Sequence, residues 1–147
     1  MRFMLMVRAN SESESGVLPS AELIAEMGTY AEEMMKAGVL LAAEGLQASS
    51  KGARVKFSGG KRTVTDGPFA EAKELIAGYW LIQVKSKEEA IEWARRSPAP
   101  FGPDTEGEIE VRQVFEVTDF PPEIFPPEDA AREQELRDEL QARAGNP

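Results

Sequence analysis

The chain has 147 residues, with 26 acidic side chains against 17 basic ones and a net charge of −9 at pH 7. This length suits one domain that buries a hydrophobic core of its own. The absence of cysteine and histidine excludes disulfides, Ser-His-Asp and Cys-His catalytic triads, and zinc sites built on those ligands. We therefore expect neither a metal nor a cofactor.

No apolar stretch approaches the ~18–20 residues of a membrane helix, and the run Phe3 to Val7 is too short for a signal peptide. The sequence predicts a cytoplasmic protein with no membrane contact. A pI near 4.7 argues against nucleic acid as a partner. Residues 51–62 hold five basic side chains and no acidic one. We interpret them as a solvated face, with contact to an acidic partner as the alternative.

Residues 2–8 form an almost entirely apolar run, typical of a strand covered on both faces. Residues 10–16 show no apolar period and predict an exposed loop, with a flexible lid as the alternative. Between positions 20 and 36 apolar residues recur at steps of three and four, which predicts an amphipathic helix. Its expected N-cap is Ser20 and its expected C′ residue is Gly38. We expect Gly28, in mid-helix, to allow close packing against a sheet.

A buried strand is predicted over 39–43 and ends at Glu44-Gly45-Leu46. Alternating residues at 54–57 and 62–65 flank Gly59-Gly60, which indicates a β-hairpin. Residues 70–77 predict a short helical turn that ends at Gly78, and 79–84 predict a central strand.

Ser86 and Glu89 form an expected capping box at the start of a helix that Pro98 stops. Ile109, Val111 and Phe115 alternate with charged residues and predict the last strand. After two prolines, Leu136 and Leu140 form only a narrow helical stripe in a polar tail.

This element order predicts an α+β, ferredoxin-like fold. It is the split βαβ arrangement, an antiparallel sheet with helices on one face and an inserted β-hairpin. We place that domain at residues 1–120 and a C-terminal extension at 121–147. Because the strands are apolar on both sides, a second copy would cover the open face of the sheet. We therefore predict a homodimer that forms a dimeric α/β barrel.

The motif at residues 66–69, Asp-Gly-Pro-Phe, is followed by Glu71, by Lys-Glu-Leu at 73–75, by Gly-Tyr at 78–79 and by the 110–112 strand. Over most of residues 1–117 the chain resembles the YCII-related, DGPF-domain family of the dimeric α/β-barrel superfamily. The resemblance implies a ferredoxin-like dimer with a cleft near the sheet. Relatives in the wider family look like small isomerases or dehydrochlorinases that use a His and Asp pair. Some DGPF-type proteins accompany extracytoplasmic-function sigma factors.

The chain departs from that family at two points. It has no histidine, so Asp66 matches the motif aspartate without an imidazole partner. Where the family pattern reads Pro-Ser, the chain has Ala48-Ser49, which we expect to loosen the turn.

Two carboxylates are candidate catalytic residues. Asp66 would act as a general base if burial beside Phe69 or Tyr79 made it a stronger base. The residue types around it favour a structural role, because an aspartate before Gly-Pro is a turn former. Glu44, at a strand end, is either a partner carboxylate or a hairpin salt-bridge residue.

The candidate ligand-binding residues are Phe69, Glu71, Lys73, Tyr79 and Arg112. Lys73 and Arg112 would hold an anion, although Arg112 could instead pair with a charge across strands. Tyr79 would donate a hydrogen bond, with a satisfied core tyrosine as the alternative.

Two functions fit these residues. The first is an enzyme or binder of a small acidic or enol-like metabolite, with proton-transfer or isomerase-like chemistry. The second is a non-catalytic dimeric accessory or regulatory module, associated with sigma-factor signalling if the resemblance extends that far.

Overall fold

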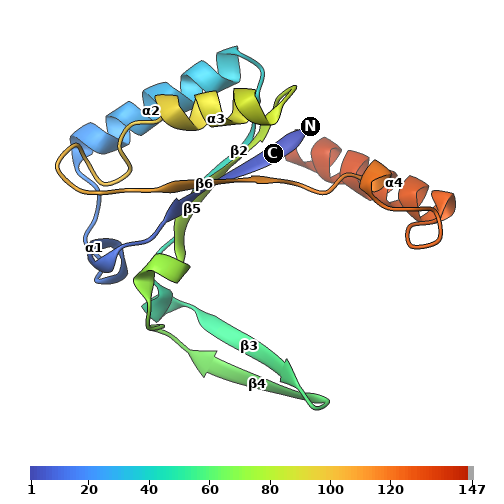
Figure 1. Ribbon diagram of the computed structural model, residues 1–147, viewed down its shortest axis with the longest axis horizontal. Coiled ribbons are helices and arrows are strands. Elements are labelled where there is room, and N and C mark those ends of the chain that lie inside the picture. Colours follow the sequence, from blue (N-terminus) through green and yellow to red (C-terminus); the bar gives the residue numbers. More distant parts are fainter. Residues whose placement is uncertain (146–147) are drawn as a thin grey trace. The chain divides into compact units, whose positions relative to one another are not determined.

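The computed structural model describes residues 1–145 of the chain. The chain divides into two compact units, Met1–Val114 and a second one that begins at Phe115. The first unit contains strands and helices in the following order (Figure 1): β1 Arg2–Arg8, α1 Ser11–Glu14, α2 Ala21–Lys36, β2 Leu40–Gly45, β3 Ala53–Ser58, β4 Lys61–Asp66, β5 Ile76–Gln83, α3 Lys87–Arg96 and β6 Ile109–Gln113.

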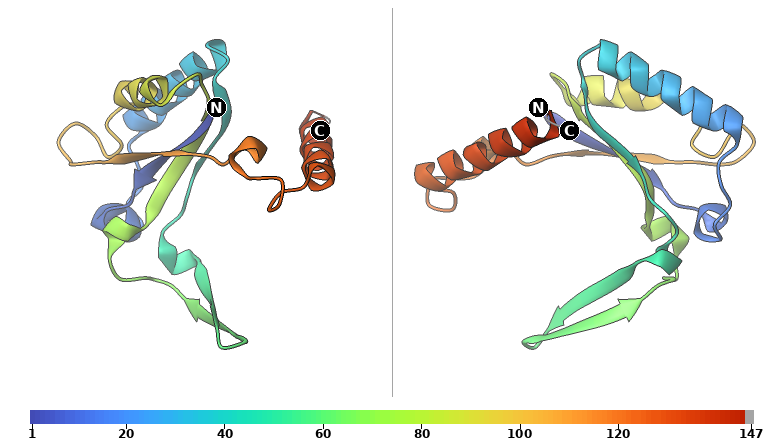
Figure 2. Two further views of the ribbon diagram at one scale, coloured as in Figure 1. Left: turned by 45° about the vertical axis from the view of Figure 1, so that its right-hand side comes forward. Right: turned by 180° about the vertical axis from the view of Figure 1, so that it is seen from behind.

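Four strands form one antiparallel sheet in the order β2-β5-β1-β6. The two central strands are the first and third of this sheet along the chain, as in the split βαβ arrangement. Helices α2 and α3 lie together over one face of the sheet (Figures 1 and 2). The second sheet consists of β3 and β4 alone. The predicted α+β, ferredoxin-like fold with an inserted hairpin is therefore confirmed.

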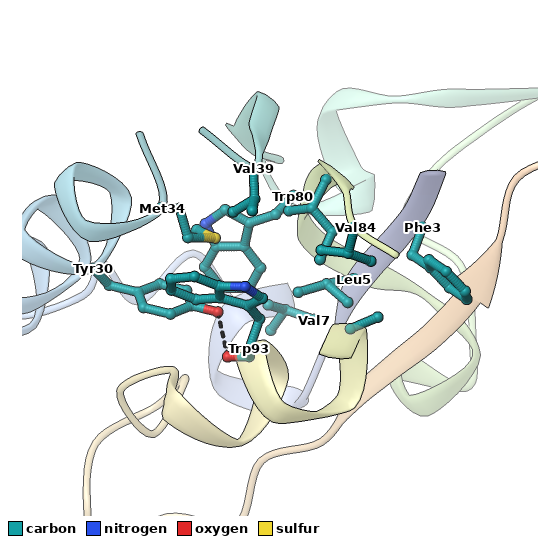
Figure 3. Close-up of a cluster of buried hydrophobic side chains, with 11 residues drawn as sticks. Phe3, Leu5, Val7, Tyr30, Met34, Val39, Trp80, Val84 and Trp93 are labelled. Carbon is teal, nitrogen blue, oxygen red and sulfur yellow. Dashed lines mark hydrogen bonds between the residues drawn. The ribbon is translucent and has the colours of Figure 1, made fainter. Parts of the chain in front are cut away.

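The core lies between this sheet and its two helices (Figure 3). Alternate residues of β1 and β5 are buried on the helix side, as the period of a strand requires. From α2, Tyr30 packs edge-on against Trp80 with ring centroids 5.4 Å apart. Its hydroxyl donates a hydrogen bond of 2.6 Å to the carbonyl oxygen of Trp93 in α3. Burial raises the pKa of Tyr30 to about 12, because the phenolate would lose its solvation.

The other face of the sheet has no helix against it within the first unit (Figure 2). Its central residues are Met6, paired with Tyr79, and Met4, paired with Leu81. All four are only half-buried. We call these four side chains the open sheet face. The homodimer predicted through this face stays a prediction.

Two sequence predictions near the N-terminus are wrong. Residues 11–14 form the short helix α1 instead of a loop, because Asn10 accepts a hydrogen bond from the Ser13 amide and Ser13 Oγ accepts one from the Asn10 amide. A helix of one turn has no apolar period that could reveal it. Gly28 packs against nothing, since a Cβ atom there would have no neighbour within 4 Å.

Strand β5 begins at Ile76, so the helical turn before it is confined to residues 72–74 and Gly78 lies inside the strand. A Cβ atom on Gly78 would come within 3.0 Å of the Glu44 carbonyl oxygen in β2, and the close approach of the two backbones requires glycine. Strand β6 ends at Gln113, which leaves Phe115 outside the sheet.

The helix ends follow their predicted caps closely. Ser20 Oγ accepts a hydrogen bond from the Leu23 amide, and Gly38 adopts a φ of 72° beyond the end of α2. Ser86 Oγ accepts one from the Glu89 amide, but the Glu89 carboxylate binds the amide of Lys85 instead of closing the box on Ser86.

The second unit contains helix α4, Pro127–Ala144, whose exposed residues include Leu136 and Leu140. Ahead of it the rings of Phe115, Phe120 and Phe125 lie in sequence with centroids 4.9 and 5.8 Å apart. None of the helices within residues 1–145 combines the length and the apolar character needed to cross a membrane.

Candidate functional site

A cleft of about 830 Å³ lies in the first unit, beside the N-terminal half of α2 and the ends of β2 and β5. Several parts of the chain line it: Val7, residues 12–20, residues 23–31 of α2, residues 43–51, residues 77–80 and residues 100–102. Most of the lining is apolar. The large apolar side chains Val17, Leu18, Ile24 and Leu46 line it and stay exposed.

Gly28 gives the cleft room where α2 borders it. The glycine lines the cleft, and the space in which its side chain would lie is open. A glycine in mid-helix costs roughly 0.5–1 kcal/mol relative to alanine. Here the missing side chain leaves open space in the cleft.

Helix α1 is attached to the wall of the cleft by a group of hydrogen bonds centred on Ser49. The Ser49 amide donates to Glu14 Oε1 at 3.0 Å, and Ser49 Oγ donates to Glu14 Oε2. The same Oγ accepts a hydrogen bond of 3.0 Å from the Phe69 amide. Ser49 thus joins α1 to the motif at 66–69, and the turn at 48–49 that we expected to be loose is held on both sides.

The motif at 66–69 closes the base of the β3–β4 hairpin against residues 49–52. The Gly67 amide donates to the Gly52 carbonyl oxygen at 3.0 Å. The backbone at Gly67 passes so close to the Ser49 carbonyl that no side chain fits between them. The guanidinium of Arg54 lies over the Phe69 ring, 3.9 Å from its centroid. The motif therefore acts as a clasp that supports the wall formed by residues 47–51.

Of the seven predicted site residues, Glu44 and Tyr79 border the cleft. They are paired across β2 and β5, next to the pair of Ala43 and Trp80. Since Trp80 is buried toward the helices, strand alternation places the Glu44 and Tyr79 side chains toward the open side of the sheet. They lie at the margin of the cleft.

The other five predicted residues do not line the cleft. Asp66 ends β4 with an exposed side chain, so the burial that a general base would need is missing. Glu71 and Lys73 are exposed, and Glu71 has a left-handed backbone with φ of 62°. Phe69 is half-buried under Arg54.

Arg112 lies on β6 with its side chain 71% exposed, 3.3 Å from Glu110 on the same strand. Glu110 also pairs with Arg8 of β1 at 3.6 Å. These are surface ion pairs, which contribute at most about 1 kcal/mol each. Arg112 therefore pairs within its own strand and not, as its structural alternative predicted, across strands, while Glu110 pairs across strands with Arg8.

Sequence reasoning missed Ser49, Glu14 and the apolar wall of the cleft. The exposed pair Val17-Leu18 in a polar loop and the glycine in the middle of α2 were the signals available in the sequence. Within residues 1–145, no three Asp or Glu side chains come close enough together to hold a metal ion.

The chain is a small α+β domain with a ferredoxin-like sheet. It has an inserted hairpin closed by Asp-Gly-Pro-Phe and a cleft beside its first long helix, α2. These features agree with the fold that the family resemblance implies. The family described as YCII-related domain matches residues 1–118, and the chain belongs to it. An uncharacterized protein of Rhizobium meliloti (strain 1021) is 32% identical to it over 89 residues, which cover 58% of this chain and 72% of that protein.

The substitution Asp66→Asn separates the two roles of the motif aspartate. Asparagine turns and caps about as well as aspartate, and Asp66 is exposed. We expect the free energy of unfolding, measured by thermal denaturation, to change by only a few tenths of a kcal/mol, and the affinity for a ligand in the cleft to stay the same. A loss of binding of tenfold or more without a loss of stability would instead make Asp66 part of the site.

Proposed function

We propose that this protein binds a small, largely apolar molecule in the cleft between α2 and the ends of β2 and β5. The observation that supports this most directly is the apolar lining around the open space at Gly28. A volume of about 830 Å³ falls within the range of roughly 300–1,000 Å³ typical of small-molecule sites. The clasp at 66–69 and the bonds of Ser49 to α1 support two of its walls.

The lining favours a neutral ligand over the acidic metabolite expected from the sequence. The charged residues that line the cleft are Glu12, Glu44 and Lys51, two acids and one base. The two residues expected to hold an anion, Lys73 and Arg112, lie elsewhere. If the protein is also a catalyst of proton transfer, Glu44 is better placed than Asp66, since it borders the cleft.

The cleft can be tested by filling it from α2. In Gly28→Phe the new ring would occupy the open space, and we expect the affinity for the neutral fluorescent probe N-phenyl-1-naphthylamine to fall at least tenfold. Gly28→Ala is the matched control, because it replaces the same helix glycine with a single methyl group that meets nothing within 4 Å. Fluorescence titration and far-ultraviolet circular dichroism would give affinity and folding together. Parent-like binding by Gly28→Phe, or no binding by the parent protein, would contradict the proposal.

The second candidate function is a dimeric accessory module, the alternative predicted from the sequence. The half-buried open sheet face favours it, because apolar rows on a sheet are normally covered. The sigma-factor association implied by the resemblance belongs to this candidate.

A further inference from the structure

The β3–β4 ribbon, residues 53–66, is amphipathic. In its register Val55 lies opposite Val64, and Phe57, two residues along from Val55, shares their face. We call these three side chains the apolar ribbon face. Arg62 lies opposite Phe57 on this face, with its guanidinium over the Phe57 ring, 4.9 Å from the centroid. Strand alternation places Arg54, Lys56, Thr63 and Thr65 on the opposite face.

The apolar ribbon face is uncovered in the single chain. All residues of β3 and β4 are exposed, with Val55 at 52%, Val64 at 65% and Phe57 at 67%. A two-stranded ribbon alone is at best marginally stable in water. Clustered exposed apolar side chains on such an element mark an interaction surface.

The same unit has a second uncovered apolar surface, the open sheet face. The ribbon leaves the sheet from the ends of β2 and β5 and runs on the side away from α2 and α3 (Figure 2). Because every ribbon residue is exposed, it does not cover its own sheet. Hydrogen bonds around Gly67 and Ser49 fix the base of the ribbon. The ribbon therefore projects from the domain on the side where a second copy would contact the open sheet face.

Charge complementarity favours a second copy of this chain as the partner. Residues 51–66 contain five lysines and arginines and one aspartate, whereas the other 131 residues contain 12 basic and 25 acidic side chains. Two copies that each carry a charge of −9 repel one another. The ribbon is the basic segment that would offset this repulsion, and Arg62 is the basic side chain on the face that would meet the acidic body of the partner.

We propose that the β3–β4 ribbon is a dimerisation arm, whose apolar ribbon face lies against the open sheet face of a second copy. Two-fold symmetry makes the exchange reciprocal, so each sheet receives one arm. The arm of one chain and the open sheet face of the other form a site that neither chain completes alone. It does not depend on a ligand in the cleft.

The first test is the mass of the full chain in sedimentation velocity over a dilution series. The variant Val55→Thr/Phe57→Thr/Val64→Thr has a β-branched residue with high strand propensity at all three positions, which preserves the ribbon while removing its apolar face. We expect the parent to be a dimer and the dissociation constant of the variant dimer to be at least tenfold higher. Thr63→Ser/Thr65→Ser, on the opposite face of β4, is the control and should behave like the parent.

The second test uses the natural absence of cysteine. Protein with Phe57→Cys is mixed with protein carrying Met6→Cys on the open sheet face, and a short bis-maleimide should link the two different chains. Thr63→Cys should give little product. Three results would overturn the proposal: a monomeric parent at all concentrations, a dimer that the triple variant leaves intact, or equal cross-linking from Phe57→Cys and Thr63→Cys. Salt-sensitive binding of duplex DNA that only ribbon variants abolish, with an unchanged mass, would assign the ribbon to nucleic acid instead.

Discussion

Replacement of Gly67 by alanine is expected to destabilise the protein by about 3 kcal/mol or more, the range reached when a side chain is forced into a filled site. A Cβ atom at this position would lie 1.8 Å from the carbonyl oxygen of Ser49 and 2.6 Å from its carbonyl carbon. Both atoms are backbone, so no rotation of a side chain can relieve the overlap. The 66–69 clasp would have to separate from residues 49–52.

Urea denaturation measures this effect. We expect a lower midpoint concentration of urea, while the slope of the unfolding free energy against urea concentration stays unchanged. Gly28→Ala is the control, because it is the same exchange at a position where the new methyl group meets open space. In mid-helix that change should stabilise the protein by roughly 0.5–1 kcal/mol. If Gly67→Ala were as stable as the parent, the clasp would not hold the wall of the cleft.

The sheet and its two long helices could be predicted because their sequences carry the period of each element. Residues 2–8 are apolar on both sides of a strand, and α2 shows apolar steps of three and four between Ser20 and Lys36. The turn at Gly59-Gly60 could be predicted because both residues adopt positive φ, 57° and 76°, which glycine accepts most readily. These are local properties of the chain.

The cleft could not be predicted in the same way, because several separate segments build it and each looks like an ordinary loop, helix or strand by itself. The motif at 66–69 drew attention to the correct part of the chain. Its contribution passes through Ser49, a residue twenty positions away along the sequence whose hydroxyl joins Phe69 to Glu14. Only the fold brings these three residues together, so the sequence leaves open whether the motif is part of a site or a turn, and does not reveal that it supports the wall of a cleft.

A final expectation concerns alkaline pH, where Tyr30 should lower the stability of the protein. Its hydroxyl donates to the Trp93 carbonyl oxygen near the end of α3. In a continuing α-helix that carbonyl would accept from the amide of Ser97, but the Ser97 amide donates to Ala94 instead. Tyr30 therefore satisfies a carbonyl left free at a helix end, and it can do so only while its hydroxyl keeps its proton.

Burial is the main reason that the pKa of Tyr30 rises from 10.0 to about 12; nearby Arg96 opposes the rise and Glu33 adds to it. In the unfolded chain the tyrosine ionises around pH 10, while the folded protein still holds the proton. The unfolded state then binds fewer protons, so stability falls as pH increases. The stabilisation is complete below pH 10, and the loss amounts to about 1 kcal/mol by pH 11 and about 2 kcal/mol by pH 12.

Tyr30→Phe isolates this contribution, because all other groups titrate alike in both proteins. At pH 7 the variant should be less stable by about 1–2 kcal/mol, since it leaves the Trp93 carbonyl without its partner. Between pH 10 and 12 that difference should shrink and then reverse, because phenylalanine has no proton to lose. Urea denaturation of both proteins at pH 7, 10, 11 and 11.5 measures the difference directly. If the unfolding free energies of the two proteins ran parallel over this pH range, the hydrogen bond to α3 would not be holding the Tyr30 hydroxyl in its protonated form. The packing of α2 against α3 at this point would then depend on ring contacts alone.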